Sequence, residues 1–244
     1  MKKILTSCLA LLVLGLCSVL YAENLAVQSI SGLDETGWRS FWKPRFEEKF
    51  RQAESGPIDI VFLGDSITNF WEGNGSEAYK KWYADRKVLN LGFSGDRTQQ
   101  TIWIVKDSGI LEKIDPKLFV LMIGTNNVGW GETNPAQTLE GIQTILKIVR
   151  EKKPNAKIVL FEVFPRGANN QDGMRQLVNE INKGIPALCD GENIFFASIN
   201  GKLLEADGET LTRDTMPDLL HPGPKGYEFW AEAIEPYIKK FVEK

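Results

Sequence analysis

The sequence predicts an α/β protein built around one parallel sheet with helices on both faces. Two observations lead to this fold class. Short, continuous apolar runs alternate along the chain with longer segments whose apolar residues recur at helical spacing, an alternation typical of a doubly wound sheet. The apolar runs are also continuous, which fits parallel strands that are covered on both faces. We therefore expect about five parallel strands in a single domain.

The boundaries of the elements follow from these runs. Strands are expected at residues 58–63, 88–91, 118–123, 157–163 and 194–197. Helices are expected at 76–84, 97–110, 135–152, 174–189 and 224–242. The third of these helices has the clearest start, because Asn134 is a suitable N-cap and Pro135 takes the first helical position. An amphipathic segment at 38–53, interrupted by Pro44, precedes the first strand.

The first 22 residues have the pattern of a secretory signal peptide. Lys2 and Lys3 precede an apolar stretch at 4–20, and Ala22 ends the segment before a polar residue, as cleavable signals do. We therefore expect export to the periplasm or the medium, without stable membrane insertion once the signal is removed.

A lipoprotein signal is the alternative. It would need a cysteine in a suitable setting, and this chain offers Cys8 and Cys17. Cys17 follows the bulky Leu16, and Cys8 lies too close to the N-terminus. These features favour cleavage over lipidation.

Composition excludes several classes of function. The net charge of −3 becomes −5 when two lysines leave with the signal, which argues against nucleic acid or an anionic membrane surface as a partner. Cys189 then remains as a single thiol, so no intrachain disulfide can form. With one histidine and one thiol, the chain lacks the residues that zinc sites prefer, although a site made entirely of carboxylates stays open.

Polar residues and glycines follow three of the expected strands. Ser66 comes after the first strand, Gly95 after the second and Asn126 after the third. Ligands of open parallel sheets bind beyond the carboxyl ends of the strands. Backbone N–H groups at a helix start or after a glycine, and a side-chain amide, can all donate to a substrate oxygen. Taken singly, each residue also fits a helix cap or an ordinary turn.

His221 is the only histidine in the chain, and it stands three residues after Asp218. Histidine is the side chain that titrates near neutral pH without a perturbed environment. Asp218 could accept a hydrogen bond from Nδ1, which would leave Nε2 free to take a proton from Ser66. A lone histidine is otherwise more often a structural residue, and the surrounding motifs decide between these readings.

Four blocks of sequence together resemble the SGNH, or GDSL, hydrolases. They are GDSIT at 64–68, NLGFSGDRT at 90–98, GTNN at 124–127 and DLLHP at 218–222. Each lies just after an expected strand, and the match covers nearly all of residues 57–243. Within the family, the chain is most similar to the catalytic subunits of the platelet-activating-factor acetylhydrolase Ib type, through stretches such as FPRG at 164–167. GDSIT departs from GDSL without changing its first three residues.

The resemblance implies a flavodoxin-like three-layer α/β/α sandwich that works without a metal or an organic cofactor. It implies Ser66 as nucleophile, His221 as general base and Asp218 as the residue that orients the base. The implied oxyanion hole consists of the N–H groups of Ser66 and Gly95 and the side chain of Asn126. The expected organisation is then a signal peptide at 1–22, an N-terminal extension packing on the domain at 23–56, and the hydrolase domain at 57–244.

The expected function is therefore a serine esterase that cleaves short-chain, above all acetyl, esters through an acyl-enzyme. The expected partner is a small-molecule or glycan ester, and a carbohydrate O-acetyl ester is favoured. The alternatives are a phospholipid or lysophospholipid ester and a noncatalytic carbohydrate-binding protein on the same fold. Trp130 and Arg166 should lie on the loops of the active face, where they are candidate substrate contacts. The sequence leaves the oligomeric state open.

Overall fold

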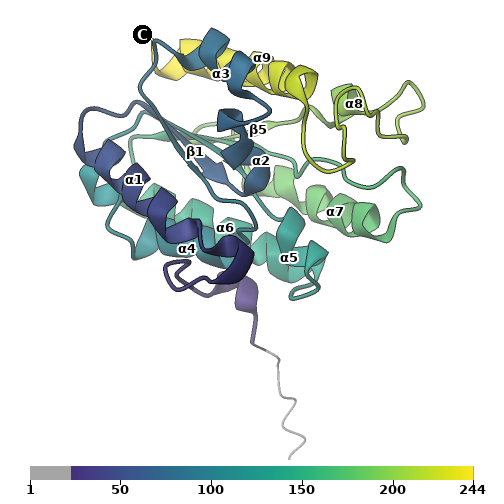
Figure 1. Cartoon of the computed structure of the whole chain (residues 1–244), viewed down its shortest axis with the longest axis horizontal. Helices are drawn as coiled ribbons and strands as arrows, with labels where there is room; N and C mark the ends of the chain where they lie inside the picture. Colours follow the sequence, from purple (N-terminus) through teal and green to yellow (C-terminus); the bar gives the residue numbers. More distant parts are fainter. Residues whose placement is uncertain (1–22, 244) are drawn as a thin grey trace, which may run out of the picture.

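The computed structural model describes residues 23–243, and these form a three-layer α/β/α sandwich (Figure 1). The strands are β1 (Ile60–Gly64), β2 (Val88–Gly92), β3 (Leu118–Met122), β4 (Lys157–Phe161) and β5 (Ile194–Ala197). They lie in the order β2-β1-β3-β4-β5, and all neighbours are parallel. The predicted fold class is confirmed, and the strands lie close to their expected positions.

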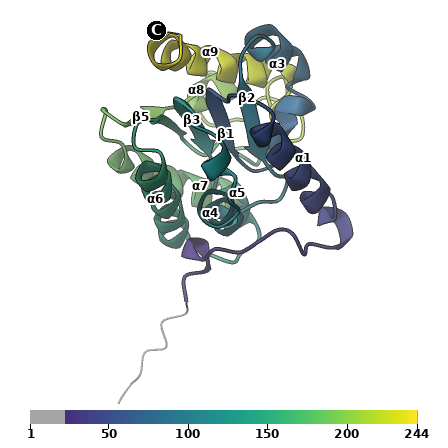
Figure 2. The same cartoon turned by 90° about the vertical axis from the view of Figure 1, so that its left-hand side faces the viewer.

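Helices cover both faces of this sheet (Figure 2). On one face α3 (Ser76–Tyr83) packs beside α9 (Pro224–Phe241), and α9 contacts β3 and β4. The other face carries α4 (Thr98–Lys106), α6 (Pro135–Lys152) and α7 (Gly173–Gly184), which pack in that order. Between residues 23 and 243, no helix is both long enough and apolar enough to span a membrane.

The remaining helices are shorter or lie before the sheet. Three short α-helices, α2 (Ser66–Asn69), α5 (Thr125–Gly129) and α8 (Asn200–Leu203), follow the ends of β1, β3 and β5. In the N-terminal extension, α1 (Trp42–Glu54) lies against β2, preceded by single 3₁₀ turns at Leu25–Val27 and Gly37–Arg39. Other 3₁₀ turns are Phe70–Glu72, Leu111–Lys113 and Ile185–Leu188.

The sequence predicts the first residues of the helices more accurately than the last residues. The predicted cap of α6 is confirmed, since the Asn134 side chain accepts from the Gln137 N–H at 2.9 Å and the Gln137 side chain accepts from the Asn134 N–H at 3.1 Å. The expected helix at 174–189 ends earlier, at Gly184, where a 3₁₀ turn takes over.

The expected interruption at Pro44 is wrong. Helix α1 begins at Trp42, so Pro44 lies in its first turn. Backbone N–H groups of a first turn have no acceptor inside the helix, and proline therefore costs no hydrogen bond there.

Two paired glycines let the chain turn closely over the end of the sheet. Gly64 of β1 pairs with Gly92 of β2. A Cβ on Gly64 would lie 2.1 Å from the Thr68 hydroxyl and 2.4 Å from the Met122 carbonyl oxygen, and one on Gly92 would lie 2.4 Å from the Asn69 nitrogen. Larger residues would therefore push α2 away from the strands. The glycines thus seat the helix that carries Ser66 at the carboxyl edge of the sheet.

Candidate active site

Ser66, His221 and Asp218 form a chain of hydrogen bonds at this edge. The Ser66 hydroxyl lies 2.8 Å from His221 Nε2, and His221 Nδ1 lies 2.7 Å from Asp218 Oδ2. Both ring nitrogens are thus engaged, and the carboxylate selects the tautomer with hydrogen on Nδ1. Nε2 is then an acceptor directed at the serine hydroxyl. The three predicted residues therefore lie in the order that proton removal from serine requires.

The loop that carries the histidine is held by its own carboxylate. Asp218 Oδ1 accepts from the His221 N–H at 2.7 Å and from the Leu220 N–H at 2.9 Å. Burial favours the neutral acid, but these bonds and the imidazole outweigh it and keep the pKa of Asp218 below its ordinary value. The residue thus stays an anion that can stabilise an imidazolium.

Leu219, between these residues, has a φ of +63° and is the one non-glycine residue of the described chain with a positive φ. Such a backbone conformation costs roughly 1 kcal/mol or more for a residue with a side chain. The Leu219 carbonyl accepts from the Gly167 N–H at 2.9 Å. This bond fixes the turn and joins the histidine loop to the loop after β4.

Three residues that line the pocket of Ser66 carry groups that can donate hydrogen bonds. The Ser66 N–H opens α2, where a helix has no internal acceptor for it. Gly95 has a φ of +79° and lines the same pocket. The Asn126 amide donates one hydrogen to the Asp96 carbonyl at 2.9 Å, which orients the group and leaves its second hydrogen available. The structure thus brings the predicted oxyanion-hole residues together around the serine.

Asp65 caps the helix that begins at Ser66. Its Oδ1 accepts from the Ile67 N–H at 2.9 Å and caps α2. The side chain is fully buried, and this burial raises the pKa of Asp65 to about 6 even though the cap and the charges of His221 and Arg166 lower it.

The pocket in front of the serine is small, with a volume of about 240 Å³. Its walls come from four loops and from the N-terminal extension. They consist of Trp38, Ser66, Phe70, Ser94, Gly95, Asn126, Trp130, Leu220 and His221. Sites for drug-sized molecules are commonly about 300–1,000 Å³, so this pocket fits a small group.

The two candidate substrate contacts have different positions. Trp130 lines the pocket and is 44 % exposed. Arg166 does not line it, because its guanidinium donates to the carbonyl oxygen and the hydroxyl of Thr125 at 3.2 and 3.1 Å. These oxygens belong to the first residue of α5 and satisfy the arginine there, so the described pocket gives no support to Arg166 as a substrate contact.

Sequence reasoning missed two neighbouring residues of the extension. Trp38 is 64 % exposed and forms a wall of the pocket, with its ring centroid 6.0 Å from that of Trp130 in an edge-to-face arrangement. Arg39, by contrast, is 2 % exposed and makes an ion pair with Asp96 at 2.6 Å. No local pattern distinguishes these residues, because their partners lie more than fifty positions further along the chain.

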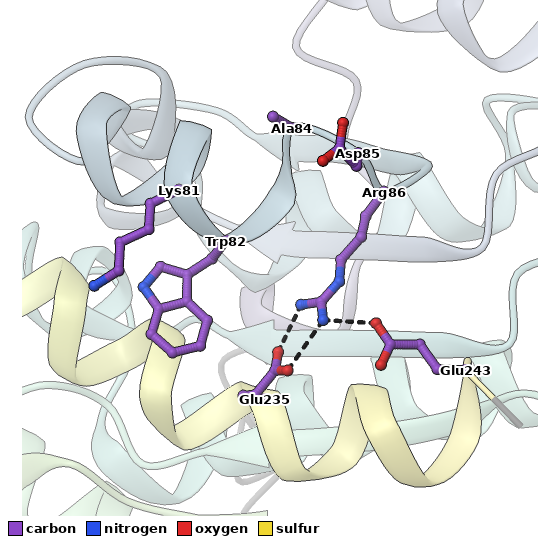
Figure 3. A pocket seen from close by; sticks show the side chains of 7 residues that line it. All are labelled: Lys81, Trp82, Ala84, Asp85, Arg86, Glu235 and Glu243. Carbon is purple, nitrogen blue, oxygen red and sulfur yellow. Dashed lines mark hydrogen bonds and ion pairs between the residues drawn. The ribbon is translucent and has the colours of Figure 1, made fainter.

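A larger hollow of about 430 Å³ lies elsewhere, between α3 and the end of α9 (Figure 3). Arg86 dominates it, and its guanidinium bonds to the carboxylates of Glu235 and Glu243, each at 2.6 Å. Arg86 is thus paired with two carboxylates of the hollow, and none of the residues around Ser66 lines it. We interpret it as a cluster of ion pairs that joins the turn after α3 to the C-terminal end of α9. In residues 23–243, no cluster of three or more His, Cys, Asp or Glu side chains has the arrangement of a metal site.

Fold and site together have the geometry that a serine hydrolase requires. At the carboxyl edge of the parallel sheet, a hydroxyl, an imidazole and a carboxylate are linked by hydrogen bonds, and Gly95 and Asn126 line the same pocket. A model of the GDSL-like lipase/acylhydrolase family matches residues 62–229. The chain belongs to this family and is a carboxylic ester hydrolase, which excludes the noncatalytic alternative.

Individual relatives agree with this assignment. The chain is 29 % identical over 223 residues to rat platelet-activating factor acetylhydrolase IB subunit alpha2, covering 90 % of each protein. It is 31 % identical to the human alpha1 subunit, over 75 % of this chain and 77 % of that one. Among solved structures, a GDSL-like lipase from Bacteroides thetaiotaomicron has a TM-score of 0.67 and 22 % identity, over 81 % of this chain and 97 % of that one.

Proposed function

We propose that this protein is a serine esterase that removes short acyl groups, acetyl above all, through an acyl-enzyme formed on Ser66. The observation that carries the proposal is the unbroken chain from the Ser66 hydroxyl through His221 to Asp218, next to the N–H of Gly95 and the amide of Asn126. Each group has one role in a two-step ester hydrolysis.

In the first step the Ser66 oxygen attacks the ester carbonyl while His221 Nε2 takes the hydroxyl proton. The carbonyl oxygen becomes an oxyanion, which accepts hydrogen bonds from the N–H groups of Ser66 and Gly95 and from Asn126 Nδ2. The intermediate then collapses, the bond to the alcohol breaks, and His221 gives its proton to the leaving oxygen. The acyl group remains on Ser66 as an ester.

In the second step water replaces the alcohol. His221 takes a proton from the water, the resulting hydroxide attacks the acyl carbonyl, and the same donors bind the second oxyanion. Ser66 leaves as the alcohol with the proton returned by His221, and the carboxylic acid is released. Asp218 stays ionised throughout and balances the imidazolium of each step.

The size of the pocket supports a short acyl group. A volume of about 240 Å³ must hold both the acyl group and part of the alcohol. One additional methylene in a confined apolar site changes the free energy by about 1–3 kcal/mol. A site that already fits an acetyl group therefore selects strongly against longer acyl chains.

The alcohol side favours a carbohydrate. Trp38 and Trp130 are both partly exposed at this pocket and form its aromatic wall. Flat indole surfaces with free N–H groups suit the C–H face and hydroxyls of a sugar ring, because such side chains are apolar with a polar edge. A lipid ester is the second candidate, and it is favoured by the relatives named platelet-activating factor acetylhydrolases.

A two-part assay tests the proposal. Hydrolysis of p-nitrophenyl acetate, butyrate and octanoate should fall steeply with acyl length, and Ser66→Ala should lower kcat by roughly 10⁴–10⁶. Acetylated xylose should then be a better substrate than an acetylated lysophospholipid. A Ser66→Ala variant with a tenth of the wild-type turnover would end the nucleophile assignment, and a preference for the lipid would move the substrate to the second candidate.

Export is part of the same proposal, since the signal pattern at 1–22 lies outside the described residues. If the signal is cleaved, the N-terminus of the protein recovered from the periplasm or the medium begins near Glu23. Recovery of the uncleaved chain in the cytoplasm would contradict this.

A further inference from the structure

We infer that Arg39, in the N-terminal extension, is a positioning residue of the oxyanion hole. It lies outside the residues 62–229 that the family model covers, and it does not line the pocket. The inference rests on the proposed function, because it assigns Arg39 a role in holding the donors that this function uses.

The guanidinium holds the segment that carries the Gly95 donor. Arg39 Nη1 donates to the Gly95 carbonyl at 3.0 Å, and Nη2 donates to Asp96 Oδ1 at 2.6 Å. The planar fork of arginine can hold a carbonyl and a carboxylate at fixed relative positions, which a lysine cannot. With both groups fixed, Gly95 cannot rotate freely in spite of lacking a side chain.

The second donor is fixed through the same residue. Asn126 Nδ2 donates to the Asp96 carbonyl at 2.9 Å, and the Trp42 indole N–H donates to Asp96 Oδ1 at 2.8 Å. Asp96 thus connects the loop after β2 to the loop after β3. Gly95 directly precedes Asp96, and Asn126 is held by the Asp96 carbonyl, so two donors from different loops depend on the position of Asp96. Arg39 is the charge that pairs with the Asp96 side chain.

Burial makes this dependence strong. Arg39 is 2 % exposed and Asp96 is fully buried. Burial raises the pKa of Asp96, and the charge of Arg39 together with the hydrogen bonds from Trp42 and Arg39 opposes that shift and favours the carboxylate. Removing a single partner from a buried ion pair is costly, because the other charge is left without compensation. Loss of Arg39 should therefore shift Asp96, and with it both donors.

Loss of Arg39 should weaken binding of the transition state more than binding of the substrate. The substrate oxygen acquires its full charge only after attack, so misplaced donors reduce kcat and leave KM largely unchanged. A displacement of about 1 Å in an active site costs roughly 10²-fold in rate. We expect Arg39→Ala to lower kcat for p-nitrophenyl acetate by about 10- to 100-fold, and Arg39→Lys to restore only part of that loss.

Arg45 offers a matched control from the same extension. Its Nε donates to the Gly92 carbonyl at 2.8 Å, and its Nη1 pairs with Glu72 at 2.6 Å. Arg45 therefore also joins the extension to the end of β2, but it contacts neither Gly95 nor Asp96. Arg45→Ala should lower the melting temperature and leave kcat within about threefold of wild type.

The experiment measures kcat, KM and Tm for Arg39→Ala, Arg39→Lys and Arg45→Ala at a temperature where each variant is folded. The rate at which paraoxon phosphorylates Ser66 is a second readout, because the phosphoryl oxygen occupies the same hole. The inference is supported if Arg39→Ala slows both kcat and phosphorylation while Arg45→Ala slows neither.

Two results would overturn it. One is an equal fall in kcat for Arg39→Ala and Arg45→Ala, which would indicate general loosening of the extension. The other is a change confined to KM. If Ser66→Ala were active, the proposed function itself would fail, and this outcome is independent of the arginine variants. If Arg39→Ala does not fold, Arg39→Lys supplies the comparison, and full kcat in that variant contradicts the role of the guanidinium fork.

Discussion

The indole of Trp38 lies against the Cα of Gly95. A Cβ added to this glycine would lie 2.5 Å from Trp38 Cη2, and the glycine also has a φ of +79°. An exposed tryptophan of the extension thus limits which residue can occupy this proposed oxyanion-hole position. Both the contact and the backbone conformation require glycine here.

Gly95→Ala should therefore destabilise the fold by roughly 1–2 kcal/mol and lower kcat. The Trp38→Ala, Gly95→Ala double variant should recover part of the lost kcat, because it removes the contact but keeps the strained φ. A double-mutant cycle on kcat with p-nitrophenyl acetate measures the coupling, which we expect to be about 0.5–3 kcal/mol. Additive effects would show that the tryptophan and the glycine act independently.

Asn126→Ala should lower kcat by about 10²–10³-fold, or roughly 3–4 kcal/mol. The substitution removes one donor to the oxyanion and also the bond to the Asp96 carbonyl. Steady-state kinetics separates the outcomes, since loss of transition-state stabilisation reduces kcat more than it raises KM. A change in KM alone would make Asn126 a contact of the bound substrate instead.

Modification of one imidazole should abolish activity. His221 is the only histidine of the chain, and its ring bonds to both Ser66 and Asp218. A histidine-selective acylating reagent should therefore inactivate the untagged protein at a stoichiometry of one, and hydroxylamine should restore activity. Complete acylation with hydrolysis unchanged would end the proposed mechanism.

Asp65 should make the stability of the protein depend on pH in an unusual direction. Its pKa is about 6 in the folded protein and 3.8 as a free side chain. The folded state therefore binds the proton more tightly, and the associated stability is complete below pH 4 and is lost as the pH rises to about 6. At about 1.4 kcal/mol per unit of pKa, the loss is on the order of 3 kcal/mol.

The variant Asp65→Asn keeps an oxygen that can cap α2 but does not titrate. As the pH rises from 4 to 7, the wild type should lose stability relative to the variant. The contributions of titrating groups that both proteins share cancel in the difference between their unfolding free energies. Denaturant titrations across this range measure the difference. A constant difference would show that Asp65 does not carry the raised pKa.

Much of this architecture follows from local pattern. Continuous apolar runs gave five strands, and residues placed after strands, such as Ser66 and Asn126, meet at one edge because parallel strands end there together. Arg39 and Trp38 could not be found in this way, since their contacts with Asp96 and Gly95 join distant segments. Arg166 was expected at the pocket, but its position depends on a hydrogen bond to Thr125 that no sequence pattern encodes.

The bond between Ser66 and His221 joins residues 155 positions apart. The proposed nucleophile is placed by the first strand and the proposed base by the last loop before the C-terminal helix, so the proposed catalysis depends on nearly the entire chain. A nascent or truncated protein that ends before Asp218 would contain the serine and all three oxyanion donors, yet no base. During synthesis or refolding, esterase activity should consequently be the last native property to emerge, and turnover is a direct assay for completion of the fold.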